Sequence, residues 1–197
     1  MSKPVAESCI QNQQVILEVL QNIFQEQGEV LEIGSGTGQH AVFFTHHMPH
    51  LTWQPSDLLD QHAGMQLWLN EVEHDRIKSP VELNVDDAVW ETEKKDYVFT
   101  ANTTHIISSA QTENMFKHVG ACLKQGGIFA QYGPFNYNGA YTSESNARFD
   151  VWLKQRNPES CIKHFETVQA LAEDNGLRLF QDVEMPANNR ILVWQKL

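Results

Sequence analysis

The sequence is poor in cysteine, in basic residues and in long apolar runs, and each shortage excludes a class of protein. The three cysteines lie far apart, so they predict neither a disulfide framework nor a paired metal or redox motif; they are Cys9, Cys122 and Cys161. No stretch has the length of a membrane span, and the first residues lack the apolar core of a secretion signal. We therefore expect a cytoplasmic protein with reduced thiols, no membrane association and no metal site.

Basic residues are also outnumbered by acidic ones. The 197 residues include 14 Lys and Arg against 25 Asp and Glu, which gives a formal net charge of −11. Such a surface repels the phosphates of nucleic acids and of anionic membranes, and no basic cluster counters it. The charge therefore favours a small-molecule partner over DNA or RNA. The length favours a single domain over residues 1–197 and leaves the oligomeric state open.

Residues 29–40 form the most informative segment of the chain, because they combine three features in a functional order. Residues 30–33 are mostly apolar and branched, which is typical of a buried parallel strand. Glycines follow at every second position, at Gly34, Gly36 and Gly38, where a backbone without Cβ atoms can turn sharply and let a ligand approach. A helical pattern then starts. Strand, glycine turn and helix are the layout of a nucleotide-binding first β-α unit.

The glycine spacing and one acidic residue distinguish between two classes of cofactor. A dinucleotide site has the pattern G-x-G-x-x-G, whereas here the third glycine, Gly38, comes one position early and Glu32 precedes the first glycine by two residues. A carboxylate suits the cationic amino group and sulfonium of S-adenosylmethionine better than it suits a pyrophosphate. The pattern resembles the first motif of class I S-adenosylmethionine-dependent methyltransferases. It counts against a nucleotide-dependent oxidoreductase, which stays the less favoured alternative.

Strand and helix patterns alternate along the whole chain. We expect helices over residues 7–27, 38–48, 58–73, 112–124, 143–156 and 165–175, and strands over 29–33, 51–55, 81–85, 96–102, 128–132, 177–185 and 190–196. This alternation predicts an α/β fold with a doubly wound, mostly parallel sheet, and the short turn 186–189 makes the last two strands antiparallel. The resemblance to class I methyltransferases implies a Rossmann-like, seven-stranded sheet in the order 3-2-1-4-5-7-6 with an antiparallel last strand.

Four segments are similar to one narrower family, the small stand-alone proteins of the methyltransferase-like-26 type. They are Val30-Leu31-Glu32-Ile33-Gly34-Ser35-Gly36-Thr37-Gly38-Gln39-His40, Trp53-Gln54-Pro55-Ser56-Asp57, Tyr132-Gly133-Pro134-Phe135-Asn136 and Glu184-Met185-Pro186-Ala187-Asn188-Asn189. The resemblance covers nearly the whole chain. The substrate of that family has no general assignment. The resemblance therefore implies the fold and S-adenosylmethionine as the cofactor, and it leaves the methyl acceptor open.

Ligands of an open α/β sheet bind beyond the carboxyl ends of its strands, and this rule selects the cofactor residues. We expect Glu32 to organise the glycine loop or to approach the amino group of the cofactor. Asp57, after the second strand, can accept hydrogen bonds from both ribose hydroxyls, although it or Ser56 could instead cap the next helix. The predicted cofactor-binding residues are Glu32, Gly34, Ser35, Gly36, Gly38, Asp57, Asp86, Asp87 and Asn102.

Residues at the ends of the third and fourth strands complete this set. Asp86 could accept from the adenine amino group, with the Asp87 amide nearby; the alternative for both is a solvated turn. Asn102 faces the methionine part of the cofactor or the acceptor. His105 lies three residues further on, where an imidazole with a pKa near 6.5 could take a proton from the acceptor, or could only pack. We predict His105 and Asn102 as catalytic residues, with Tyr132 as another proton acceptor.

The segment 134–158 is longer than a connection needs, which predicts a lid-like insertion beside the acceptor. Its charges nearly cancel, so we expect no strongly charged acceptor. Phe149 and Trp152 share a helix face and are interpreted as packing residues rather than as a substrate cage. The predicted substrate-binding residues are Tyr132, Asn136, Tyr137, Arg148 and Asn189; the family resemblance favours a pocket role for the last of them.

These patterns predict methyl transfer from S-adenosylmethionine to an unidentified, small-molecule acceptor. Residues 102–105 read Asn-Thr-Thr-His, which lacks the Asn-Pro-Pro-aromatic motif of enzymes that methylate adenine in nucleic acids. The acidic surface points the same way. A protein that binds S-adenosylmethionine without turnover and acts through partners is the remaining alternative.

Overall fold

The protein is described by a computed structural model that covers residues 2–197. Its strands are β1 (Gly28–Ile33), β2 (Leu51–Asp57), β3 (Val81–Glu82), β4 (Lys95–Ala101), β5 (Leu123–Gly133), β6 (Leu177–Met185) and β7 (Asn189–Lys196). Its helices are α1 (Glu7–Ile23), α2 (Gln39–His47), α3 (Leu59–Leu69), α4 (Ser109–Cys122), α5 (Glu144–Arg156) and α6 (Phe165–Asp174), with a short 3₁₀ turn η1 (Pro186–Asn188).

All seven strands form one sheet in the order β3-β2-β1-β4-β5-β7-β6, which confirms the predicted topology. The neighbouring pairs from β3 to β5 are parallel, whereas β7 runs antiparallel to both β5 and β6. The chain winds outward in opposite directions from β1 and β4. The carboxyl ends of these two adjoining strands therefore mark the switch point, where ligands of such sheets bind.

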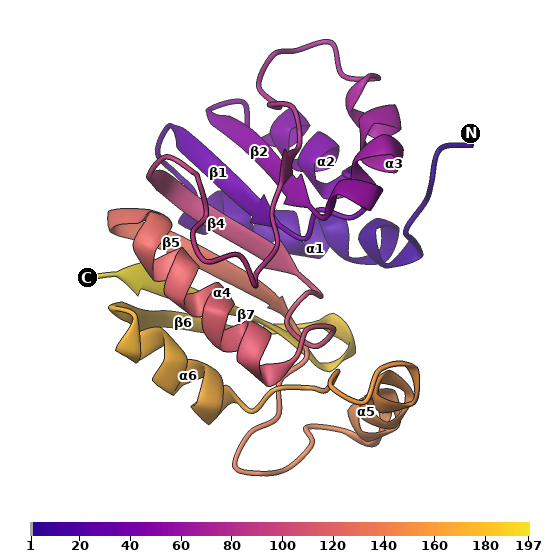
Figure 1. Cartoon of the computed structure of the whole chain (residues 1–197), viewed down its shortest axis with the longest axis vertical. Helices are drawn as coiled ribbons and strands as arrows, with labels where there is room; N and C mark the ends of the chain where they lie inside the picture. The colour runs from indigo at the N-terminus through magenta and orange to yellow at the C-terminus, as the bar shows by residue number, and fades with distance from the viewer. Residues whose placement is uncertain (1) are drawn as a thin grey trace.

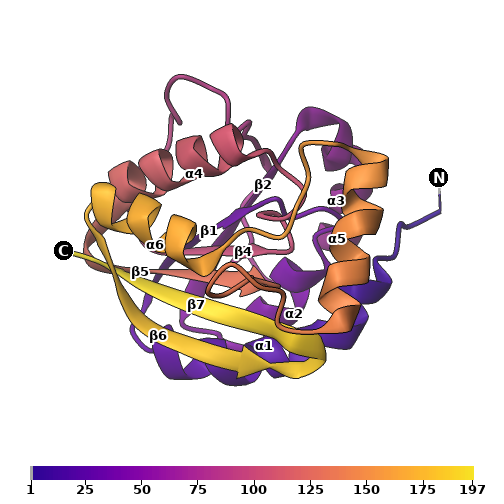
Figure 2. The same cartoon turned by 90° about the horizontal axis from the view of Figure 1, so that it is seen from below.

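Helices cover both faces of the sheet (Figures 1 and 2). On one face, α1 and α2 bury Ile16, Leu20 and Phe44 against the sheet residues Trp53 and Phe99. On the other face, α4 and α6 cover a second apolar cluster; its members include Met115, Phe116, Phe129, Val168 and Trp194. Helix α5 stands apart at one end of the sheet (Figure 2), so it is free to take part in a site there.

Several boundaries differ from those expected from the sequence, and three of them have a local cause. Helix α1 ends at Ile23 rather than at residue 27, because Phe24 leaves the helical backbone and is fully buried. Strand β3 has two residues rather than five, since a turn begins at Asn84. Strand β5 begins at Leu123 rather than at residue 128, because the chain passes directly from the last turn of α4 into the strand. No helix within residues 2–197 is both long and apolar enough to cross a membrane.

Candidate functional site

The three glycines after β1 form a loop for which glycine is required. Gly34, Gly36 and Gly38 have φ values of 72°, 54° and 82°, in the left-handed region that other residues rarely adopt. A Cβ atom at Gly34 would lie 2.5 Å from Thr103 Oγ1, and one at Gly38 would lie 2.7 Å from Met65 Cγ. A Cβ at Gly36 would meet nothing within 4 Å. The middle of the loop therefore borders open space, which is a cradle for a ligand.

Asp57 holds this loop from the end of β2. Its Oδ2 accepts a hydrogen bond of 2.7 Å from the Gly36 amide, and its Oδ1 accepts one of 2.8 Å from the Leu58 amide. Leu58, not Asp57, is the N-cap of α3, so Asp57 lies one residue outside the helix and does not cap it. Ser56 Oγ donates to the Glu32 carbonyl instead. The carboxylate of Asp57 keeps lone pairs that could accept from a diol.

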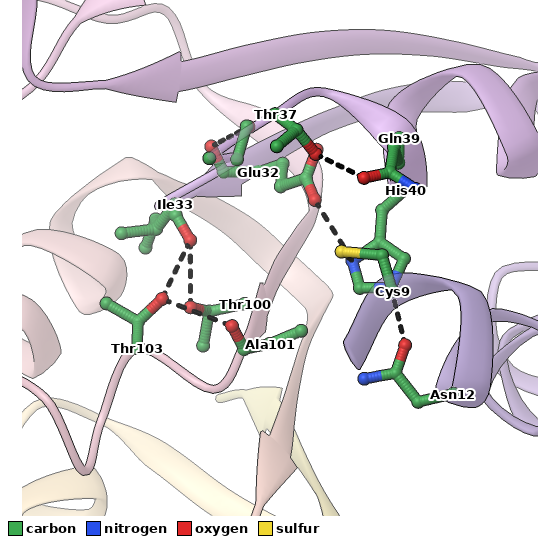
Figure 3. A network of polar contacts seen from close by, with 12 residues as sticks. Cys9, Asn12, Glu32, Ile33, Thr37, Gln39, His40, Thr100, Ala101 and Thr103 are labelled. Atoms are coloured by element: carbon green, nitrogen blue, oxygen red, sulfur yellow. Dashed lines mark hydrogen bonds and ion pairs between the residues drawn. The ribbon is translucent and has the colours of Figure 1, made fainter. Parts of the chain in front are cut away.

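Glu32 lies beneath the loop in a buried polar network (Figure 3). Its Oε2 accepts from Trp53 Nε1 at 2.9 Å, and its Oε1 lies 3.8 Å from His40 Nδ1. Burial raises the pKa of Glu32 to about 7 and lowers the pKa of His40 to about 4. His40 is therefore neutral at pH 7, and the two side chains do not form a full ion pair. With 1% exposure, Glu32 is placed to organise the loop from inside the protein.

The same network ties the start of α1 to the loop. His40 Nε2 is 2.8 Å from Asn12 Oδ1, and Gln39 Oε1 accepts from Thr37 Oγ1 (Figure 3). Gln39 Oε1 also accepts from the Ala6 amide. The sequence interpretation did not include α1 in the site. A signal was present, because polar residues recur on this helix at the spacing of one face: Ser8, Gln11 and Asn12.

Asp86 and Asp87 form an exposed turn after β3. Asp86 Oδ2 accepts from Gln111 Nε2 at 2.7 Å, and its Oδ1 accepts from Asn114 Nδ2 at 3.2 Å. Both oxygens are thus held by α4. This geometry matches the turn that was the alternative to adenine binding, and a role at the adenine stays a prediction.

A pocket of about 960 Å³ lies where the carboxyl ends of β4 and β5 face α1, α5 and η1. Four of the predicted residues line it: Asn102, His105, Tyr132 and Asn189. One face of α5, within the segment 134–158 that was predicted to lie beside the acceptor, forms a wall of the pocket. The sequence interpretation assigned none of its lining residues to the substrate site; they are Asn146, Phe149, Trp152, Leu153 and Arg156. Two non-glycine residues in the pocket wall have left-handed backbones, Asn102 with φ 62° and Ala187 with φ 57°. Such strained positions concentrate at functional sites.

His105 lies in the pocket wall, and its acid-base properties differ from the expectation. It is 6% exposed, and the edge of its ring faces Phe149 at a centroid distance of 5.2 Å. Burial, helped by the charge of Lys163, lowers the pKa of His105 to about 4. Its ring is therefore neutral at pH 7 and can accept a hydrogen bond, but it is a weak base.

Three predicted substrate residues, Asn136, Tyr137 and Arg148, do not line this pocket, and a substrate role for them stays a prediction. Asn136 pairs through its backbone with Lys163 beside α6, and its Nδ2 donates to the Ile162 carbonyl. Tyr137 donates to Asp182 Oδ2 at 2.9 Å, which turns its ring toward β6. Arg148 points to solvent, with a side chain 73% exposed. Asn136 and Tyr137 lie outside because residues 136–138 bond to the start of α6 and to β6, and Arg148 lies on the outer face of α5.

No group of three or more His, Cys, Asp or Glu side chains is arranged to hold a metal ion in the part of the chain that the structure describes. The groups that the site offers are the glycine loop, the Asp57 carboxylate, and the polar side chains and single arginine, Arg156, of the pocket. Asp57 bonds the loop from one side and the Glu32 carboxyl group lies buried beneath it, and acidic groups in these positions favour a ligand without a pyrophosphate.

The chain belongs to the family described as "Protein of unknown function (DUF938)", whose model matches residues 3–196. Solved structures with a similar fold include an O-methyltransferase family protein from Burkholderia thailandensis, with a TM-score of 0.84 and 18% identity over 96% of this chain and 57% of that one. A putative O-methyltransferase from Nostoc punctiforme has a TM-score of 0.82 and 16% identity, over 95% of this chain and 56% of that one.

Human N-acetylserotonin methyltransferase, in complex with S-adenosylmethionine, has a TM-score of 0.74 and 13% identity, over 94% of this chain and 55% of that one. The chain thus spans little more than half the length of these proteins. At such identities the likeness shows a Rossmann-like methyltransferase fold. The narrower resemblance to the methyltransferase-like-26 type stays a prediction.

Proposed function

We propose that this member of the DUF938 family binds S-adenosylmethionine at the carboxyl ends of β1 and β2 and transfers its methyl group to a small molecule in the adjoining pocket. The observation that carries the proposal is the open space over Gly36 beside the Asp57 carboxylate. Asn102 follows β4, the neighbour of β1, and lines the pocket. The loop and the pocket therefore meet at the switch point. The methyltransferase names of the structural neighbours support the same cofactor.

The residues of the site fit the chemical groups of this cofactor. The glycine loop admits a ligand to its backbone, and Asp57 has acceptors left for the two ribose hydroxyls. Glu32 contributes negative charge beneath the loop once it is ionised, which suits a cationic ligand. When bound, S-adenosylmethionine supplies an activated methyl group, and its carbon–sulfur bond breaks with the electron pair going to sulfur as the acceptor forms the new bond.

The residues of this chain then contribute orientation, exclusion of water and proton handling. Asn102 has a fixed, left-handed backbone whose amide donates to the Tyr132 carbonyl at 2.9 Å, so its side chain is held at the border between loop and pocket. The walls from α1 and α5 shield the acceptor, and alignment there supplies most of the acceleration. His105 is neutral and takes the acceptor proton late, since its pKa of about 4 makes it a weak base.

Two glycine variants test the cofactor site. Gly36→Ala places a methyl group in the open space over the loop, so S-adenosylhomocysteine binding should fall by at least a factor of about a hundred in calorimetric titration. Gly126→Ala is the matched control, because Gly126 also has a positive φ, 77°, and open space around its would-be Cβ, but lies in β5 away from the loop. Both variants should lose a similar stability, about 1 kcal/mol of left-handed backbone strain.

The two measurements separate folding from binding. The proposal is supported if the two variants have equal melting temperatures and only Gly36→Ala loses S-adenosylhomocysteine binding. Unchanged binding in Gly36→Ala, or binding of NAD but not of S-adenosylhomocysteine by the unmodified protein, would overturn it. Methyl transfer itself is then assayed by mass spectrometry on a metabolite extract supplied with S-adenosylmethionine.

A further inference from the structure

The walls of the pocket carry a charge opposite to that of the protein. Of the 25 acidic residues of the chain, none within residues 2–197 lines the pocket, and no lysine does. Its one permanently charged wall residue is Arg156, in the last turn of α5. Among the described residues, no carboxylate lies within ion-pair distance of Arg156. The composition of the segment 134–158 predicted no preference for a charged acceptor, because composition does not show which charged side chain faces the pocket.

The wall next to Arg156 is aromatic. The rings of Phe149 and Trp152 stack with centroids 5.6 Å apart and planes 19° apart. Trp152 is 46% exposed although it is large and apolar, and Ile106 in the facing wall is 55% exposed. The Arg156 guanidinium lies 4.7 Å from the centre of the Trp152 ring. Because this guanidinium lies over the Trp152 ring, a flat apolar ligand that packs on the exposed part of the aromatic pair would lie beside a cation.

Some of the uncharged polar residues of the pocket lie at its cofactor end. Asn102, His105 and Tyr132 lie at the ends of β4 and β5, whereas Arg156 lies at the far end of α5. Neutral donors and acceptors at one end suit a hydroxyl group. A guanidinium at the other suits a carboxylate, which it can bind through two parallel hydrogen bonds. A cationic amine would find no counter-charge among the described residues of the wall.

We infer that the methyl acceptor is a planar aromatic hydroxy acid, whose ring lies against Phe149 and Trp152 and whose carboxylate pairs with Arg156. This inference rests on the proposed function and names its substrate class. The hydroxyl oxygen forms the bond to the methyl carbon as the carbon–sulfur bond breaks onto sulfur. The hydroxyl proton passes to His105 or to solvent, so the products are a methyl ether, S-adenosylhomocysteine and one proton.

Direct binding tests the inference without turnover. The protein saturated with S-adenosylhomocysteine is titrated calorimetrically with para-hydroxybenzoate and with the longer para-hydroxyphenylpropanoate. Each acid is compared with its methyl ester, which lacks the charge, and para-hydroxybenzoate also with cis-4-hydroxycyclohexanecarboxylate, which lacks the flat ring. We expect at least one acid to bind about five- to fiftyfold more tightly than its ester. This gain in affinity lies between the small contribution of an exposed ion pair and the larger contribution of an enclosed, bidentate arginine–carboxylate pair. The saturated acid should bind more weakly than the aromatic one.

Two arginine variants on the same helix localise the effect. Arg156→Gln should bind acid and ester alike, while its affinity for the ester stays as in the unmodified protein. Arg148→Gln removes the same charge from α5 at a position that points to solvent, so it should keep the preference for the acid. Trp152→Ala should weaken acid and ester by the same factor, since it removes ring contact and no charge.

The possible outcomes are distinct. Equal affinity for acid and ester, a preference that survives in Arg156→Gln, or no binding by any member of the panel would overturn the inference. Arg156→Gln that only lowers the melting temperature would mean that the arginine serves the end of the helix. If S-adenosylhomocysteine does not bind but the acid does, the proposed function fails while the ligand class of the pocket stands. If S-adenosylhomocysteine binds and the acids do not, only the ligand class fails.

Discussion

At the scale of single residues, burial controls the protonation of the groups under the site. Glu32 and His40 are both nearly inaccessible, and burial disfavours the charged form of each. At pH 7 and without a ligand, His40 is therefore neutral and Glu32 is only partly ionised. A cationic ligand above the loop would favour ionised Glu32, so the network can respond to cofactor binding by releasing a proton. This coupling follows from placing an acid inside β1, which the sequence already indicated.

The raised pKa of Glu32 predicts a pH-dependent stability difference for Glu32→Gln. The pKa in the folded protein is about 7, above the ordinary 4.5, so the stability from the bound proton is fully present below pH 4.5 and is lost as the pH rises through 7. The glutamine keeps an acceptor for Trp53 and never ionises. Relative to the unmodified protein, Glu32→Gln should therefore gain on the order of 2–3 kcal/mol between pH 5 and pH 8.

Urea denaturation of both ligand-free proteins at pH 5, 6, 7 and 8 measures this difference. His40 contributes with the opposite sign, because its folded pKa of about 4 lies below 6.5 and its stabilisation is lost as the pH falls. Both proteins contain His40, so its contribution largely cancels in the comparison. A stability difference that is constant from pH 5 to pH 8 would show that Glu32 does not titrate in this range.

At the scale of elements, two side chains at helix starts have different roles. Ser108 caps α4 in a capping box with Gln111, through mutual hydrogen bonds of 3.1 and 3.0 Å. Asp57 precedes α3 but bonds the glycine loop. Asp57→Ala should therefore weaken S-adenosylhomocysteine binding about ten- to a hundredfold, since charge-assisted hydrogen bonds of about 1.5–3 kcal/mol are lost. Ser108→Ala should cost about 1 kcal/mol of stability with affinity unchanged.

Melting temperature and calorimetric affinity, measured on both variants, decide between these roles. If Asp57→Ala lowers the melting temperature by as much as Ser108→Ala does and binds normally, Asp57 has a structural role only.

The cap at Ser108 also explains an error in the sequence interpretation, which placed the start of α4 at Thr112. Ser108 and Gln111 form the S-x-x-Q signal of a capping box, and this signal places the start at Ser109.

Sheet order and helix positions were predictable because they depend on local patterns and on a known topology. The glycine loop was predictable for the same reason, since its left-handed backbone favours glycine at every second position from Gly34 to Gly38. The pocket was predicted only in part, because it combines side chains from α1, the end of β4, α5 and η1, which are distant in sequence. Helical periodicity showed that Phe149 and Trp152 share a face, but the direction of that face depends on tertiary packing.

At the scale of the whole molecule, the two ends of the sheet have separate tasks. The carboxyl ends of the strands carry the loop and the pocket, whereas an ion pair connects the amino ends of β1 and β4. Glu29, at the start of β1, accepts hydrogen bonds of 2.8 Å from both Lys78 and Lys95. Lys95 begins β4 and is only 3% exposed, so it depends on this carboxylate for its counter-charge. The bonds from Lys78 and Lys95 lower the pKa of Glu29 to about 2.

This separation predicts that Glu29→Gln lowers stability without changing the site. The variant should lose about 1–3 kcal/mol at pH 7, because the buried ammonium of Lys95 keeps only a neutral partner. S-adenosylhomocysteine affinity should stay unchanged, since the substitution lies at the opposite end of β1 from Gly34. Glu144→Gln is the matched control: it removes the same charge from a side chain 96% exposed and should alter stability by less than about 0.5 kcal/mol.

The pH dependence of stability tests the role of Glu29 most directly. Because the folded pKa of Glu29 lies below the ordinary 4.5, its stabilisation is present above pH 4.5 and is lost as the pH falls toward 2. The stability gap between the unmodified protein and Glu29→Gln should therefore narrow from pH 5 to pH 3, while the gap for Glu144→Gln stays near zero. Denaturation curves across this range measure both gaps. A gap for Glu29→Gln that persists undiminished at pH 3, or a loss of ligand affinity at pH 7, would mean that the two ends of the sheet are not independent.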